Sequence, residues 1–131
     1  MQKMLVLFLG LLCFVGCSDK VQLHGNVTFE EDGTPLTFGS VVFATETFEA
    51  RGTIETNGKY TMGSIDLADG VPKGSYKVYI SGASEEVAPN TMWSLIDPQY
   101  SNFATTPLTC DIPAPNNTFD IKVPKNPQPR P

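Results

Sequence analysis

Apolar and polar residues alternate along most of the chain after residue 20. Between residues 21 and 29 the odd positions are apolar or glycine and the even positions are polar, which is the period of a half-buried β-strand. The run at 39–45 is almost continuously apolar and predicts a strand covered on both faces. The same alternation predicts further strands with the inward residues Phe48, Ala50, Gly52 and Ile54; Tyr60 and Met62; Tyr76, Val78 and Ile80; Leu108, Cys110 and Ile112; and Phe119, Ile121 and Val123.

Turn residues separate these runs. Asn57-Gly58 lies between two alternating runs and predicts a tight hairpin. Residues 83–107 show no sustained period, and within them we expect a short strand or a helical turn at 92–96. Residues 124–131 have a proline at about every second or third position, which predicts an extended, disordered tail.

Seven short strands joined by turns, most with one apolar face, are typical of a β-sandwich. We therefore expect an all-β chain with a single antiparallel β-sandwich of about seven strands at residues 21–123. Cys110 shares one face of its strand with Leu108 and Ile112, which predicts a buried core thiol. Cys13 and Cys17 precede this domain, and a lipoprotein signal would remove the first and lipidate the second. Cys110 would then have no partner, and the sandwich would have to be stable without an intramolecular disulfide.

The first residues predict a secretory signal. Lys3 precedes an apolar run that ends at Gly16-Cys17, before three polar residues. This run is too short for a transmembrane helix, which needs about 20 apolar residues. Val15-Gly16-Cys17 resembles the lipobox of bacterial lipoproteins, with Phe14 where leucine is usual. The resemblance implies cleavage after Gly16 and a lipid on Cys17, and an ordinary signal peptide is the alternative.

The lipobox divides the chain into a signal peptide at 1–16, a lipidated N-terminus and short linker at 17–20, the sandwich at 21–123 and the tail at 124–131. The chain has 9 Lys and Arg against 14 Asp and Glu, a net charge of −5. No basic patch is present, so nucleic acid is excluded as a partner. An acidic domain is not attracted to anionic lipid either, which leaves the acyl chains on Cys17 as the membrane contact.

Catalytic and metal-binding groups are few. The one histidine, His24, falls on the polar face of its strand and predicts a surface residue rather than a general base. One histidine and one free cysteine cannot assemble a zinc site. The acidic runs at 30–32 and 66–70 could supply calcium ligands, but turn chemistry explains both. We expect no catalytic residue, no cofactor and no metal site.

Short motifs between residues 23 and 80 occur in the order of a transthyretin-like, carboxypeptidase-regulatory-like domain. They are LHGNV at 23–27, DGTPL at 32–36, GSVVF at 39–43, TNGKYTM at 56–62 and VPKGSYKV at 71–78. The second half, with IDPQY at 96–100, TPL at 106–108 and NTFDI at 117–121, resembles small planctomycete-type lipoproteins that contain this domain behind a lipobox. The resemblance covers nearly all of the mature chain. It implies a Greek-key sandwich without catalytic activity of its own.

These features predict a non-enzymatic lipoprotein, anchored in the cell envelope through Cys17, that acts as a structural or interaction module. Ser18 stands where some bacteria use aspartate to retain lipoproteins at the inner membrane, which favours the outer membrane. Trp93, Tyr100 and Phe103 suggest an alternative, a glycan- or small-ligand-binding protein that uses this loop. Packing of the same aromatic rings over an open end of the sandwich is the simpler explanation. An accessory subunit of a secreted enzyme is a third interpretation, and an envelope protein or glycan is the expected partner.

Overall fold

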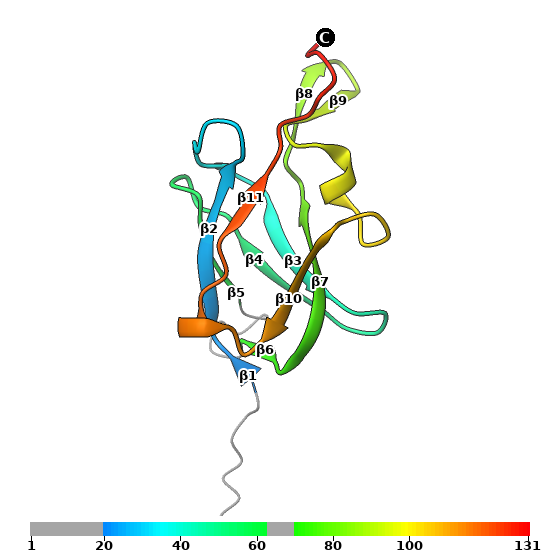
Figure 1. Ribbon diagram of the computed structural model, residues 1–131. Helices are drawn as coiled ribbons and strands as arrows, with labels where there is room; N and C mark the ends of the chain where they lie inside the picture. The colour runs from blue at the N-terminus through cyan, green and yellow to red at the C-terminus, as the bar shows by residue number, and fades with distance from the viewer. Residues whose placement is uncertain (1–19, 63–69) are drawn as a thin grey trace, which may run out of the picture.

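The computed structural model describes residues 20–62 and 70–131, which form two β-sheets packed face to face (Figure 1). The seven strands that make up these two sheets within the described ranges match the number predicted. In spatial order, the four-stranded sheet contains β10 (Leu108–Ile112), β7 (Gly74–Ser81), β3 (Ser40–Ala44) and β4 (Glu49–Thr53), and the three-stranded sheet contains β11 (Ile121–Val123), β2 (Leu23–Phe29) and β5 (Lys59–Met62).

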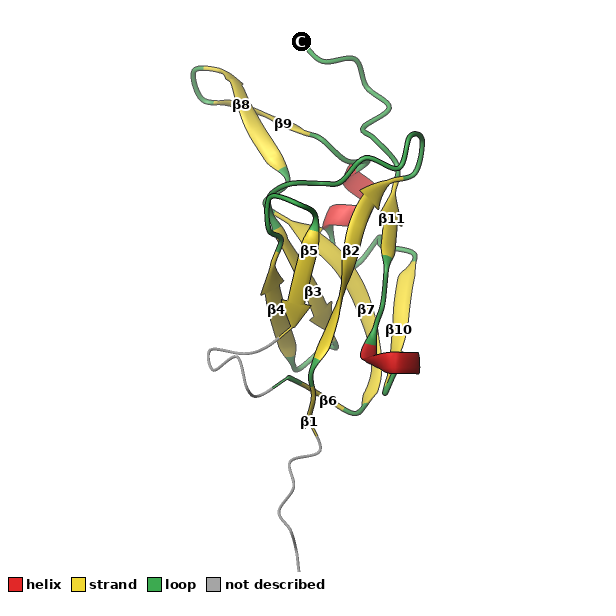
Figure 2. Cartoon of the chain, turned by 90° about the vertical axis from the view of Figure 1, so that its left-hand side faces the viewer, coloured by secondary structure: helices red, strands yellow, loops and turns green. Residues whose placement is uncertain are grey.

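Two smaller pairs lie at opposite ends of the sandwich. β1 (Lys20–Val21) pairs with β6 (Val71–Pro72) at one end. At the other end β8 (Ser84–Ala88) and β9 (Thr91–Ser94) form a hairpin that projects from the body, close to the C-terminus (Figure 2). Two short 3-10 helices, η1 (Pro98–Ser101) and η2 (Pro115–Asn117), complete the elements of the described residues.

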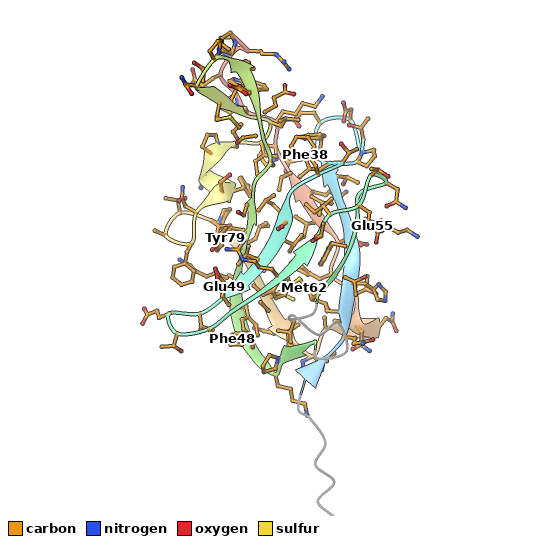
Figure 3. All side chains as sticks on the ribbon, turned by 180° about the vertical axis from the view of Figure 1, so that it is seen from behind. Phe38, Phe48, Glu49, Glu55, Met62 and Tyr79 are labelled. Atoms are coloured by element: carbon orange, nitrogen blue, oxygen red, sulfur yellow. The ribbon has the colours of Figure 1, made fainter. Side chains whose placement is uncertain are left out.

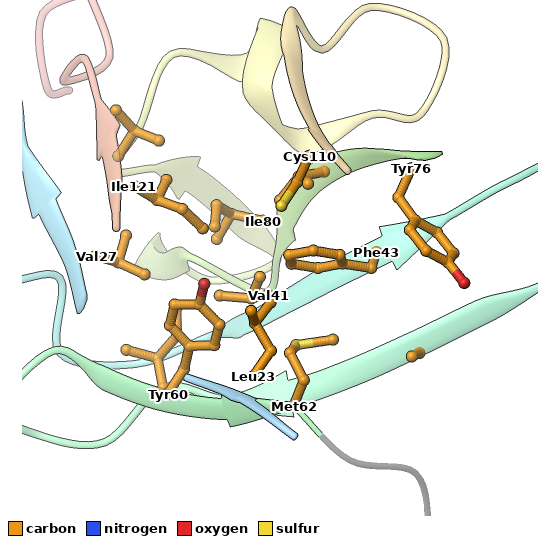
Figure 4. Close-up of a cluster of buried hydrophobic side chains, with 14 of the residues drawn as sticks. Leu23, Val27, Val41, Phe43, Tyr60, Met62, Tyr76, Ile80, Cys110 and Ile121 are labelled. Carbon is orange, nitrogen blue, oxygen red and sulfur yellow. The ribbon is translucent and has the colours of Figure 1, made fainter. Parts of the chain in front are cut away.

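The predicted alternation matches the burial of the strands. In β2 the odd positions are buried and the even positions are exposed or half-buried, because one face points to the opposite sheet. Val41, Val42 and Phe43 of β3 are all fully buried, which confirms a strand covered on both faces. The core between the sheets is made of aliphatic and aromatic side chains from both of them, including Leu23, Val27, Val41, Phe43, Tyr60, Met62, Ile80 and Ile121 (Figure 4).

A close backbone approach joins the C-terminal segment to β2. A Cβ atom at Gly25 would overlap the carbonyl oxygen of Phe119, so only glycine fits there. The same carbonyl accepts a hydrogen bond from the Tyr60 hydroxyl, and the Phe119 amide donates to the His24 carbonyl at 2.9 Å. The Phe119 ring also meets Phe43 edge-on, with ring centroids 5.9 Å apart. Phe119 therefore contacts both sheets.

One pairing departs from the antiparallel prediction. β11 runs parallel to β2, with Ile121 opposite Val27 and Val123 opposite Phe29. The chain crosses from β10 in one sheet to β11 in the other through residues 113–120, and it bridges to His24 at Thr118 near the start of β2. Since β11 enters the sheet at the end where β2 also begins, the two strands run in the same direction.

The Asn57-Gly58 turn forms as predicted, but it does not join two strands of one hairpin. Gly58 has a φ of +86°, and the turn is closed by hydrogen bonds between Glu55 and the residues at 58 and 59. β4 then pairs with β3 and β5 pairs with β2, so the turn connects the two sheets. Pairing between them is limited to the bridge Ile54–Tyr60.

The tail at 124–131 is bound to the domain, and the prediction of a disordered tail is wrong for its first residues. Asp97 donates its amide to the Pro124 carbonyl at 2.9 Å, and the Asn126 amide donates to the Leu95 carbonyl at 3.0 Å. The Asn126 side chain also donates to the Ser94 carbonyl at 2.8 Å. These hydrogen bonds come from individual polar groups and produce no periodic pattern in the sequence. The proline-rich composition therefore predicted disorder although the segment is bound.

We expect Gly25→Ala to lower the free energy of unfolding by about 1–3 kcal/mol, because the added methyl group displaces the Phe119 backbone. Urea unfolding followed by circular dichroism measures the effect. Thr53→Ala, an exposed change in β4, is the control and should change stability by no more than about 0.5 kcal/mol. Equal unfolding midpoints for Gly25→Ala and the unmodified protein would contradict the close approach.

Candidate functional site

The three aromatic residues of the predicted binding loop lie in different environments. Trp93 is in β9 of the projecting hairpin, and Tyr100 lies in η1, where it packs against the hydrophobic core. Phe103 follows η1 and lies beside Lys77 of β7. The structure therefore does not join Trp93, Tyr100 and Phe103 into one surface. Packing against the sandwich, the simpler explanation, holds for Tyr100.

The segment without sequence period contains the β8–β9 hairpin. β9 confirms the short strand expected at 92–96, although it spans Thr91–Ser94. Neither strand has a regularly buried face, and Met92 is among the most exposed large apolar residues described, at 62%. A hairpin that projects from the core has no buried side to enforce an alternation, which explains the missing pattern.

Trp93 is covered by the C-terminal tail. The Arg130 guanidinium lies 5.7 Å from the centre of the indole ring and forms an ion pair with Glu85. Glu85 stands opposite Trp93 in the β8–β9 register, so the three side chains form one cluster across the hairpin. The indole Nε1 is buried and has no hydrogen-bond partner within the described part of the chain. Within the described residues, Trp93 is therefore held by the packing of its ring and not by a hydrogen bond from the indole nitrogen.

Phe103 lines a shallow hollow of about 310 Å³ on the outer side of the four-stranded sheet. The loop at 44–49 and Tyr79 of β7 form the rest of its lining. Phe48, Glu49 and Tyr79 lie along the same region of this face (Figure 3). We call this feature, made of residues 44–49, Tyr79 and Phe103, the Phe103 hollow.

Phe48 was predicted to point inward. Its ring does lie beside that of the core residue Tyr76, but the residue is not buried. β4 begins only at Glu49, and Phe48 belongs to a tight loop closed by a hydrogen bond from the Thr45 amide to the Phe48 carbonyl at 2.8 Å. The Thr45 hydroxyl accepts from the amides of Thr47 and Phe48 at 3.2 and 3.1 Å. The ring is left 39% exposed, with its centroid 6.1 Å from that of Tyr76.

Glu49 is the polar centre of the Phe103 hollow. Its Oε2 accepts a hydrogen bond from the Tyr79 hydroxyl at 3.0 Å and from Arg51 at 3.4 Å. Partial burial, then the bond to Glu49, raises the pKa of Tyr79, so this hydroxyl remains a donor at neutral pH. Beside the hollow, next to Phe103, the Lys77 ammonium lies 4.8 Å from the centre of the Phe103 ring and donates a hydrogen bond to the Phe103 carbonyl at 3.0 Å.

A second hollow of about 430 Å³ lies on the outer face of the three-stranded sheet. His24, Lys59 and Asp120 are among its polar lining residues. His24 is exposed, which confirms the prediction of a surface histidine. In the described ranges no three His, Cys, Asp or Glu side chains are grouped in a way that could hold a metal ion.

Carboxylates of the acidic run at 30–32 accept hydrogen bonds from the turn that follows and from the C-terminal tail. The Asp32 carboxylate accepts from the Thr34 amide at 3.0 Å and from Lys125 at 2.8 Å. These hydrogen bonds, the one from Lys125 first, hold the pKa of Asp32 well below its usual range. Glu31 accepts from the Lys125 amide at 3.1 Å. The second acidic run, at 66–70, lies outside the described residues except for Gly70.

Of the two cysteines with a predicted role, Cys110 and Cys17, the structure describes Cys110. Cys110 is buried in β10, which confirms the predicted core thiol, and burial together with Asp111 raises its pKa to about 11. A neutral, buried thiol is a poor nucleophile. Cys17, the predicted lipidation site, lies outside the described residues.

Comparison with known proteins gives a likeness of fold. No protein-family model matches the chain, and no curated protein matches it. The structure is similar to that of a variant of BcpA, the major pilin subunit of Bacillus cereus, with a TM-score of 0.50 and 14% sequence identity. The match covers 82% of this chain and 30% of the pilin subunit, so the chain corresponds to less than a third of that protein. At this identity the likeness shows a shared β-rich fold.

We expect Arg130→Ala to uncover the indole of Trp93. Because Trp93 is the single tryptophan, its emission should shift to longer wavelength and acrylamide should quench it more strongly. The stability of the protein should change by less than about 1 kcal/mol, since the ion pair with Glu85 is partly exposed to solvent. Arg51→Ala is the control and should leave the emission unchanged. Identical quenching of Arg130→Ala and the unmodified protein would contradict the packing of Arg130 over Trp93.

Proposed function

We propose that this chain is a non-enzymatic lipoprotein of the cell envelope, anchored through a lipid on Cys17 and acting as a structural or interaction module. The Val15-Gly16-Cys17 sequence at the end of the apolar run is the observation on which the proposal rests. Stable attachment needs at least two acyl chains or an equivalent second contact, because one chain gives marginal membrane binding. The transthyretin-like resemblance and an outer-membrane location remain parts of this proposal.

The arrangement of the sandwich supports an anchored module. β1 begins at Lys20, at the end of the domain opposite the β8–β9 hairpin and the C-terminus (Figures 1 and 2). Residues 17–20 span at most about 14 Å when extended. A lipid on Cys17 would therefore hold the β1–β6 end close to the membrane and present the hairpin and the C-terminus on the far side.

The likeness in fold to a pilin subunit also supports a structural or interaction module. That protein is the major pilin subunit of its organism, Bacillus cereus. No helix in the described ranges has the length and apolar character needed to cross a membrane. Membrane attachment in this proposal comes from the lipid.

Metabolic labelling with an alkyne fatty acid tests the anchor. We expect the unmodified chain to be labelled and to partition into detergent, and we expect Cys17→Ala to lose both properties. Cys110→Ala is the matched control, because it removes a cysteine that is buried in β10, and it should be labelled like the unmodified chain. Equal labelling of Cys17→Ala and the unmodified chain would refute the lipid anchor.

A further inference from the structure

We propose that the Phe103 hollow binds one or two rings of a neutral saccharide. The site uses Phe103, as the aromatic-loop hypothesis expects, but its other residues come from the end of β3, the start of β4, the loop between them and β7. Trp93 and Tyr100 take no part. The proposal stands independently of the lipid anchor, because every residue it uses lies in the sandwich.

The apolar part of the site consists of aromatic rings. The rings of Tyr79 and Phe103 line the hollow, and Phe48 borders it while its own ring lies beside Tyr76. Aromatic rings provide rigid, flat apolar surface with little loss of side-chain freedom on binding. The C–H face of a pyranose ring packs on such a surface, while its hydroxyl groups point to the rim.

The rim has hydrogen-bonding groups that are already oriented. Both hydrogen bonds to Glu49 use Oε2, which leaves Oε1 as an acceptor for a ligand hydroxyl. The Tyr79 hydroxyl is fixed by its bond to the same carboxylate. The Thr45 hydroxyl holds the loop in place through two backbone amides. A rigid acceptor next to aromatic rings is the arrangement expected for small-molecule sites, which combine apolar walls with a few placed polar groups.

The charges at the hollow favour a neutral ligand. A cation would be repelled by Lys77 and Arg51, which lie beside the hollow and balance the two carboxylates of its lining: the Lys77 ammonium is 4.8 Å from the Phe103 ring centre, and Arg51 is paired with Glu49. An anion would meet the carboxylates of Glu46 and Glu49. A polyhydroxylated ring without charge avoids both repulsions and can use donors and acceptors together. The volume of about 310 Å³ lies at the lower end of the range for ligand pockets, about 300–1,000 Å³.

Titration of the full chain in detergent micelles, followed by amide and aromatic NMR shifts, tests the site. The probes are three hexasaccharides, namely β-1,4-linked glucose, α-1,4-linked glucose and β-1,4-linked N-acetylglucosamine. Each is added up to about 10 mM, which would saturate a site of millimolar affinity substantially. We expect at least one of them to shift the resonances of residues 44–49, Tyr79 and Phe103 in a saturable way.

Matched variants locate the binding. Phe103→Ala should weaken the affinity about tenfold, and Glu49→Gln, an exposed change that preserves shape and folding, should weaken it several-fold. Trp93→Phe and Met92→Ala, both on the β8–β9 hairpin, should leave the affinity unchanged. Shift changes that survive in Glu49→Gln and Phe103→Ala but vanish in Trp93→Phe would overturn the assignment. So would the absence of shifts with all three saccharides, or the same shifts with tetramethylammonium chloride and none with a saccharide.

Discussion

The close approach of Phe119 to Gly25 is the contact on which the rest of the sandwich depends. The C-terminal segment can lie against β2 only because position 25 has no side chain. Burial raises the pKa of the Tyr60 hydroxyl, which therefore stays protonated and donates to the Phe119 carbonyl. The Phe119 ring extends from this point to Phe43 in the opposite sheet. One residue near the end of the chain thus contacts strands that lie far earlier in the sequence.

Once this contact is made, the positions of the later segments follow. β11 is held parallel to β2, and the tail beyond it runs along the segment at 94–97 and reaches the β8–β9 hairpin through Arg130. The interior is filled by apolar side chains and closed without a disulfide in the described residues. Surfaces available for binding are therefore the parts that the core does not use. These are the projecting hairpin and the outer face of the four-stranded sheet, where β7, β3 and β4 lie beside the Phe103 loop.

Much of the sandwich could be predicted because each of its strands buries a face. The alternation in β2, β5, β7 and β10 located these strands and their inward residues. Alternation indicates which face of a strand is buried, but it does not indicate which strand is the neighbour in the sheet. The sequence therefore did not predict the parallel pairing of β11 with β2. Phe48 follows the inward parity of β4 and its ring lies beside Tyr76, yet it precedes the first residue of the strand and remains 39% exposed. Phe103 was identified as a candidate, but Glu49 and Tyr79 join it through strand pairing that no local pattern encodes.

Native-state hydrogen exchange at the Phe119 amide tests most directly whether the C-terminal segment is an integral part of the sandwich. This amide donates to the His24 carbonyl at 2.9 Å, and the Val27 amide of β2 donates to the Gly58 carbonyl at the same distance. If the segment belongs to the core, the two amides exchange through the same global unfolding, with equal opening free energies and the same dependence on urea. Exchange of Phe119 at a lower, urea-independent opening free energy, with Val27 still protected, would show a segment that detaches by itself and would contradict the account.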